Sequence, residues 1–436
     1  MMARLRRDSF IDLRPFRESS AFTRMWVGST LAGLGGQLTV VAVMLHMFDL
    51  TGSTFAVAMI AVAGLLPMIV AGLYGGMLAD AFDRRRVALI AASVTFASTL
   101  TLAVLAWGGL ETVWWLYVLS IINSAANSIV MAARQAIVPR LLPRDLLPAA
   151  SALSGITMGV TVMGGPALAG VLVAFTGYAW TYSVDVVLML ANFLGLWTLP
   201  AIRPEGEIVR PGLESLRDGW RFLKKATNIR LQFVLDITAM TFGYPTAIFP
   251  ALGTVILGGG AITTGLLTAS IAIGAFLSSV FSGRIGRVRR HGLGIERAII
   301  AYGIAVSLFG LALLAGAAGA FAPGRVDEGH TNVAVLALAM LALVAAGAAD
   351  NVSSIFRTTM LQAAVPDSIR GRLQGVFIVV VTGGPRLGAL YAGALASLGA
   401  LWLPPLLGGI VLICLVAFLV RLSPRFRAYD SLDPQP

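Results

Sequence analysis

The chain has 436 residues, of which 57% are hydrophobic and only 12% are charged, and its mean hydropathy is +0.85. A soluble domain carries roughly 25% charged residues, so this composition excludes an ordinary water-facing surface. The net charge of +11 does not indicate nucleic-acid binding, because such proteins gather their cations on one folded face. The composition predicts a membrane protein, and we expect no nucleic acid among its partners.

Long runs without Asp, Glu, Lys or Arg divide the chain, and a spanning helix needs about 20 such mostly apolar residues. The runs cover 25–48, 50–79, 87–110, 112–133, 146–184, 237–283, 298–324 and 387–420. They predict an all-α membrane protein of about twelve spans. We expect these at 25–48, 55–79, 87–108, 112–134, 149–175, 179–200, 230–256, 262–284, 296–318, 332–356, 371–397 and 401–421, with a break inside 237–283 at Gly258–Gly260.

The Lys and Arg residues lie mostly on one side of the membrane in this predicted topology. With both termini on the same side, nearly all of the 32 Lys and Arg residues fall in loops on that side, including Arg357 in a turn over 357–372. Arg325 lies opposite, and Arg386 lies within a span. The positive-inside bias predicts a multi-pass protein of the cytoplasmic membrane with both termini cytoplasmic and no cleavable signal peptide. The single cysteine, Cys414, excludes a disulfide framework, and we expect no metal or cofactor.

The chain divides into a first bundle at 1–200, a cytoplasmic linker at 201–229 and a second bundle at 230–436. The linker is basic and amphipathic, and we expect it to contact membrane lipids. Two short strings recur in order: 135–139 matches 362–366, and 164–166 matches 383–385. They suggest a duplicated six-helix bundle, although short Ala, Gly and Pro strings can also match by chance.

The turn after the second span carries a specific motif. It contains Gly76, Asp80, Arg84 and Arg85 in the order Gly-x-Leu-Ala-Asp-x-x-x-Arg-Arg, and it resembles the cytoplasmic gating motif of the major facilitator superfamily. An aspartate at a membrane boundary is stabilised by a neighbouring helix N-terminus and by adjacent arginines. Asp83 departs from the family pattern, which usually has glycine there. The alternative is a simple positive-inside loop.

The fifth span contains Gly165, Pro166 and Gly170. It is similar to the antiporter motif of drug and metabolite exporters, although Thr161 stands where a glycine is expected. Ordinary packing of small residues explains the pattern equally well.

Further stretches, among them 216–223, 370–375 and 383–388, resemble the enterobactin-exporter branch of the superfamily over nearly the whole chain. The resemblance implies two pseudo-symmetric six-helix bundles. It also implies that spans one, four, seven and ten line a central cavity.

Ionisable and amide residues occur inside the predicted spans, where they are costly and usually functional. Asp236 and Asp350 are the candidates for proton coupling, because desolvation favours the protonated form of a carboxylate. Alternatively, Asp236 pairs with a cation such as Arg230, and Asp350 with Arg386. The candidates for the substrate cavity are Gln37, Asn123, Asn127, Asn351 and Arg386.

These features favour a proton-coupled antiporter that exports a small organic molecule, siderophore-like or drug-like, and acts as a monomer. A flippase for lysophospholipids or other lipids is the first alternative. A membrane-embedded enzyme is the second, although no nucleophile–base set or phosphate-binding loop is present.

Overall fold

The computed structural model describes residues 12–202, 221–280, 288–319, 330–365, 367–433 and 435. Most of the predicted linker, residues 203–220, lies outside these ranges. The chain forms two compact units. The first comprises Met1–Val43 and Leu66–Arg210, and the second comprises Met44–Leu65 and Pro211–Pro436. The end of the first predicted span and the start of the second therefore belong to the second unit. A division at the 201–229 linker alone would place them in the first.

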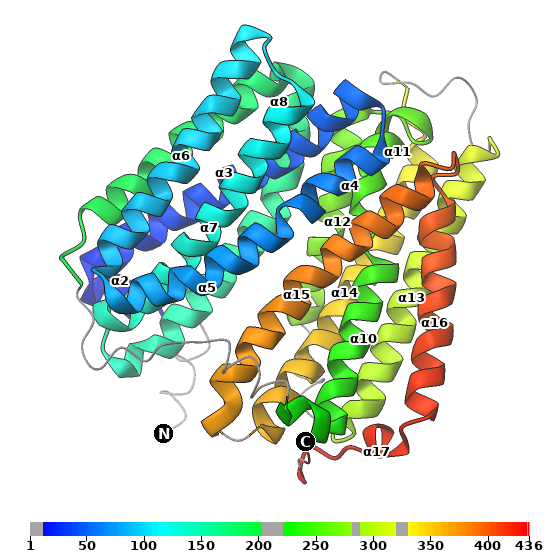
Figure 1. Cartoon of the computed structure of the whole chain (residues 1–436). Coiled ribbons are helices and arrows are strands. Elements are labelled where there is room, and N and C mark those ends of the chain that lie inside the picture. Colours follow the sequence, from blue (N-terminus) through cyan, green and yellow to red (C-terminus); the bar gives the residue numbers. More distant parts are fainter. Residues whose placement is uncertain are drawn as a thin grey trace, which may run out of the picture. The chain divides into compact units, whose positions relative to one another are not determined.

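The helices of the first unit follow the chain in order (Figure 1). They are α2 (Arg14–Glu18), α3 (Ser20–Thr51, which ends in the second unit), α5 (Leu65–Ala81), α6 (Arg84–Gly108), α7 (Val113–Leu141), η1 (Arg144–Leu146) and α8 (Leu147–Trp197). Helix α8 contains two spans, because Gly177 adopts φ 79° and breaks the helical geometry between them. Glycine reaches positive φ without a steric penalty.

The second unit contains the remaining helices. They are α4 (Thr54–Ala63), α10 (Thr227–Gly243), η2 (Thr246–Ile248), α11 (Phe249–Val255), α12 (Gly260–Val280), α13 (His291–Ala317), α14 (Val333–Ala364), α15 (Asp367–Ala396), α16 (Leu403–Arg421) and α17 (Pro424–Arg427). Gly258, Gly259 and Gly260 all have positive φ, which confirms the predicted break before α12. Helix α13 packs against α14 and α16, as Figure 1 also shows.

These helices make twelve crossings if α4 with α5 and α10 with α11 each count as one broken span. This agrees with the predicted all-α membrane fold. Nine helices in the described ranges are long and apolar enough to span a membrane on their own. One predicted boundary is wrong: α14 continues past 356 to Ala364. Arg357 is therefore a buried helical residue and not a residue of a cytoplasmic turn.

The two repeated Gly-Gly-Pro strings occupy matching packing positions. In the first unit, a Cβ added to Gly165 of α8 would collide with Gln37 of α3. In the second unit, a Cβ added to Gly384 of α15 would collide with Met240 of α10. In each case the second glycine of the string lets two helices approach closely.

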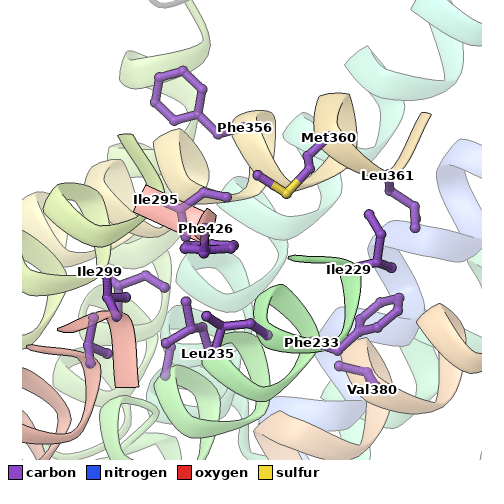
Figure 2. Close-up of a cluster of buried hydrophobic side chains, with 14 of the residues drawn as sticks. Ile229, Phe233, Leu235, Ile295, Ile299, Phe356, Met360, Leu361, Val380 and Phe426 are labelled. Carbon is purple, nitrogen blue, oxygen red and sulfur yellow. The ribbon is translucent and has the colours of Figure 1, made fainter. Parts of the chain in front are cut away.

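The second unit has a continuous apolar core around its site helices. Figure 2 shows Ile229, Phe233 and Leu235 of α10 in this cluster, with Val380 of α15 beside Phe233. Because close-packed side chains resist displacement, the core holds α10, α14 and α15 in a fixed register at the level of the polar residues described next.

Candidate functional site

A buried arginine joins two carboxylates in the second unit. Arg357 Nη1 of α14 donates to Asp236 Oδ1 of α10, and its Nη2 lies 3.4 Å from Asp350 Oδ1, two turns earlier on α14. Sequence separation of seven places Asp350 and Arg357 on the same helical face. The structure thus brings together both proton-coupling candidates, through a cation that the sequence analysis had placed in a loop.

The three charged groups differ in their exposure. The side chains of Arg357 and Asp236 are 10% and 8% exposed, whereas that of Asp350 is 34% exposed. A buried charge requires a partner, since removing it from water costs several kcal/mol. Asp236 and Arg357 supply each other with that partner. The Asp350 side chain is the most exposed of the three.

A cavity of about 120 Å³ opens onto this group. Besides the three charged residues, its polar lining comes from Gln232, Ser354 and Thr358. With all three charged groups ionised, the cavity carries one net negative charge. It therefore suits a proton, or a small cationic or hydrogen-bonding group, better than an anion.

The other polar candidates of the second unit have structural partners. Asn351 donates to Ser278 and Ser279 at 2.8 and 2.9 Å, and so joins α14 to α12. Arg386 donates through Nε to the carbonyl of Ala61 and through Nη1 to that of Thr382, both at 2.9 Å. Ala61 lies in the last turn of α4, where helix carbonyls need outside donors. Asp350 forms an ion pair with Arg357.

The candidates of the first unit are more dispersed. Asn123 of α7 donates to Ser98 and Thr99 of α6 at 3.3 and 3.2 Å. Asn127, one turn further along α7, is exposed. Gln37 packs on Gly165, which is buried together with Pro166 and Gly170.

In the turn that carries the predicted gating motif, two arginine side chains donate hydrogen bonds to backbone carbonyls of other helices or helix ends. Arg84 donates to the carbonyls of Ala79 and Ala136 at 3.2 and 2.9 Å, and so joins the end of α5 to α7. Arg85 donates to the carbonyl of Trp197 at the end of α8. A Cβ on Gly76 would meet nothing within 4 Å. The side chain of Asp80 lies outside the described part of the structure.

Asp83, which departs from the family motif, has a local role. It is the N-cap of α6 and accepts the backbone N–H of Arg85 at 3.0 Å. The same oxygen accepts the N–H of Ile202 at 3.1 Å, just after the sixth span. Aspartate is among the best N-cap residues. Asp83 therefore stabilises this turn through side-chain hydrogen bonds, which a glycine at this position could not make.

The comparisons with known proteins now decide the family. The family profile described as transmembrane secretion effector, a group within the major facilitator superfamily, matches residues 11–436. The chain belongs to this family. The chain is 25% identical to the enterobactin exporter EntS of Citrobacter koseri over 431 residues, which cover 99% of this chain and 98% of that protein. It is also 25% identical to EntS of Escherichia coli O1:K1, over 98% of this chain and 97% of that protein.

Solved structures show the same fold. The nucleoside transporter NupG aligns over 92% of this chain and 99% of its own chain, with a TM-score of 0.71 and 16% identity. The E. coli xylose transporter XylE aligns over 92% and 96%, with a TM-score of 0.65 and 15% identity. The family match and the shared fold together make this chain a multi-pass membrane transporter of the major facilitator superfamily and not an enzyme, as the sequence predicted.

One candidate residue of the site, Arg357, escaped the sequence analysis. Arg357 was missed because it follows the apolar part of its span and resembles an ordinary loop cation. In the first unit, Asp185 of α8 is fully buried and accepts the hydroxyl of Thr39 of α3 at 2.5 Å. The sequence already indicates Asp185 as an ionisable residue inside the predicted sixth span, 179–200.

Proposed function

We propose that this transporter exports a small organic molecule from the cytoplasm by exchange for protons. It acts in the cytoplasmic membrane with both termini and the 201–229 linker on the cytoplasmic side. The observation that carries the proposal is Arg357 held between Asp236 and Asp350 at a polar cavity. Such intramembrane charge clusters are typical of proton relays and substrate pathways.

The two carboxylates have different roles in this proposal. Asp236 remains ionised as the fixed partner of Arg357, because separating this buried pair would leave two uncompensated charges. Asp350 is the exchanging group, since its side chain is more exposed than that of Asp236.

Exchange follows from competition for one negative charge. A proton on Asp350 neutralises the cavity, and a cationic or hydrogen-donating group of the substrate does so equally well. The proton and the substrate therefore cannot occupy the site at the same time. Binding of one therefore releases the other, which is the requirement for antiport. A ligand shifts a conformational equilibrium only by its differential affinity for the two states.

The substrate class follows from the charge of the site. A cationic drug-like compound, or a neutral and iron-free siderophore, is compatible with one net negative charge. The relatives named as enterobactin exporters support the siderophore-like class. A fully deprotonated or iron-loaded catecholate would be repelled by the same charge.

The test uses everted membrane vesicles energised by respiration, with iron-free enterobactin and ethidium as probes. We expect uptake of at least one probe to collapse when a protonophore is added, and to be lost in the Asp236→Asn, Asp350→Asn double variant. Unchanged uptake under either condition would refute proton coupling at this site.

The orientation has a separate test. In a Cys414→Ala background, a Ser215→Cys variant places a single thiol in the predicted cytoplasmic linker. We expect no labelling by an impermeant maleimide added to intact cells, and full labelling after lysis. Labelling in intact cells would invert the proposed topology.

A further inference from the structure

A second cavity of the second unit lies at the start of α13, away from the charged cluster of Asp236, Asp350 and Arg357. It has a volume of about 490 Å³ and is lined by residues of α13, α14 and the segment before α13. Its walls are mostly apolar, with Leu293 of α13 facing Val352 and Phe356 of α14. Two arginines, Arg290 and Arg297, complete the lining. We call this cavity the α13–α14 groove.

Both arginines line the same groove. Arg290 is the N-cap residue of α13, and Arg297 lies seven residues later and so on the same helical face. The two positions are separated by about 10 Å along the helix axis, a span that two long guanidinium side chains can close on a single anion. Both residues are exposed.

The two nearby acids, Asp430 and Glu296, form their ion pairs with Arg289 and Arg427, and Asp430 also lies within electrostatic range of Arg290. Asp430, which pairs across an isolated bridge with Arg290, forms an ion pair with Arg289 at 3.1 Å. The backbone N–H of Leu432, followed by the Arg289 guanidinium, holds the pKa of the Asp430 carboxyl below its usual value. Glu296 pairs with Arg427 at 3.1 Å. Among the described residues, no carboxylate lines the groove itself.

We propose that the α13–α14 groove binds one anionic phospholipid. The phosphate lies between Arg290 and Arg297, and the start of an acyl chain lies over Leu293, Val352 and Phe356. Arginine binds phosphate oxygens through paired, charge-assisted hydrogen bonds. The groove is at the end of a membrane-spanning helix, where lipid phosphates are found, and basic residues at this level attract anionic lipids.

The first unit offers a matched comparison. A groove of about 620 Å³ lies between α5, α6 and α7, with apolar walls that include Phe82 and Ile90. Its charged end contains Arg86 with Asp83 4.0 Å away. Because this pair carries no net charge, we expect this groove to show no preference for anionic over zwitterionic lipids. The preference should therefore be a property of Arg290 and Arg297.

The experiment measures lipids retained by the purified full-length protein in native mass spectrometry. Phosphatidylglycerol or phosphatidylcholine is titrated into the detergent solution. We expect the wild-type protein to retain one tightly held phosphatidylglycerol, and an Arg290→Gln, Arg297→Gln variant to bind it roughly 30-fold more weakly. The factor follows from about 1 kcal/mol for each basic residue near an anionic lipid and 1.4 kcal/mol for each tenfold in affinity.

Three further variants separate charge, shape and folding. Arg290→Lys with Arg297→Lys should restore much of the binding, which a lost fold would not. Val352→Trp, which fills the groove, should lose the lipid although both arginines remain. Arg86→Gln in the other groove should bind phosphatidylglycerol as the wild type does.

Equal retention of phosphatidylglycerol by the wild type and the Arg290→Gln, Arg297→Gln variant would overturn the proposal. So would equal retention of phosphatidylcholine and phosphatidylglycerol by the wild type. A dimer that disappears in the double variant without a change in retained lipid would identify a second copy of this chain as the occupant, and would also overturn it.

Discussion

The Arg357 guanidinium of α14 donates to the Asp236 carboxylate of α10, although the two residues are 121 positions apart in the sequence. Both are buried, and α10 and α14 belong to one compact unit. The pair therefore belongs to the interior of the second unit, and the neighbouring Asp350, with the most exposed side chain of the three, is the residue to which we assign proton exchange.

The first prediction concerns the stability of this pair. We expect Arg357→Gln to lower the free energy of unfolding by about 3–5 kcal/mol, because it leaves a buried carboxylate without a partner. The Arg357→Gln, Asp236→Asn double variant should recover most of this loss, since it removes both charges. Thermal unfolding of the purified protein in detergent provides the measurement. Equal destabilisation of the single and double variants would mean that the pair does not contribute as an ion pair.

The second prediction uses neighbouring glycines as matched controls. Gly165→Ala and Gly384→Ala each place a methyl group against an adjacent helix, at Gln37 and Met240 respectively. Overpacking of this kind costs about 1–3 kcal/mol, which should appear as lower thermal stability and a lower yield of folded protein.

The controls are Gly164→Ala and Gly383→Ala, one residue earlier in each string, where a Cβ meets nothing within 4 Å. These variants should be neutral or slightly stabilising, because alanine is the better helix former. If all four variants behave alike, the matched packing of the two strings has no energetic role.

The third prediction separates gating from capping in the turn before α6. Asp80→Asn should impair transport at normal expression, because it removes the charge of the gating motif. Asp83→Asn should transport normally, since asparagine caps a helix as well as aspartate does and can still accept from Arg85 and Ile202. Vesicle uptake at matched protein levels distinguishes them. Normal uptake by Asp80→Asn would count against a gating role.

The sequence was sufficient for the helical architecture because hydropathy reports directly on lipid exposure. It located the break at Gly258–Gly260, since consecutive glycines favour positive φ. It failed at the end of α14, where the helix continues beyond its apolar segment to Ala364 and carries Arg357 into the core. Polar residues in the final turns of a long helix look the same in sequence as polar residues in a loop.

The partners within the site could not be read from the sequence. Nothing in the spacing of Asp236 and Arg357 connects them, because their contact depends on the tertiary packing of α10 against α14. The expected pairing of Asp350 with Arg386 rested on adjacency of spans ten and eleven. In the structure Arg386 instead donates to the carbonyl of Ala61, since the end of α4 offers it an acceptor.

The fourth prediction tests the central claim most directly, by following protons rather than substrate. Everted vesicles containing the protein are acidified inside by respiration, and the pH gradient is read with a fluorescent amine while iron-free enterobactin or ethidium is added. Substrate-driven proton efflux should partly dissipate the gradient with the wild-type protein. It should be absent with Asp350→Asn, and it should persist with the Gly383→Ala control, which adds a methyl group where nothing lies within 4 Å. Two results would contradict proton exchange at Asp350. The first is a pH gradient that does not change while the vesicles accumulate the added probe. The second is a gradient that the Asp350→Asn variant dissipates as much as the wild type does.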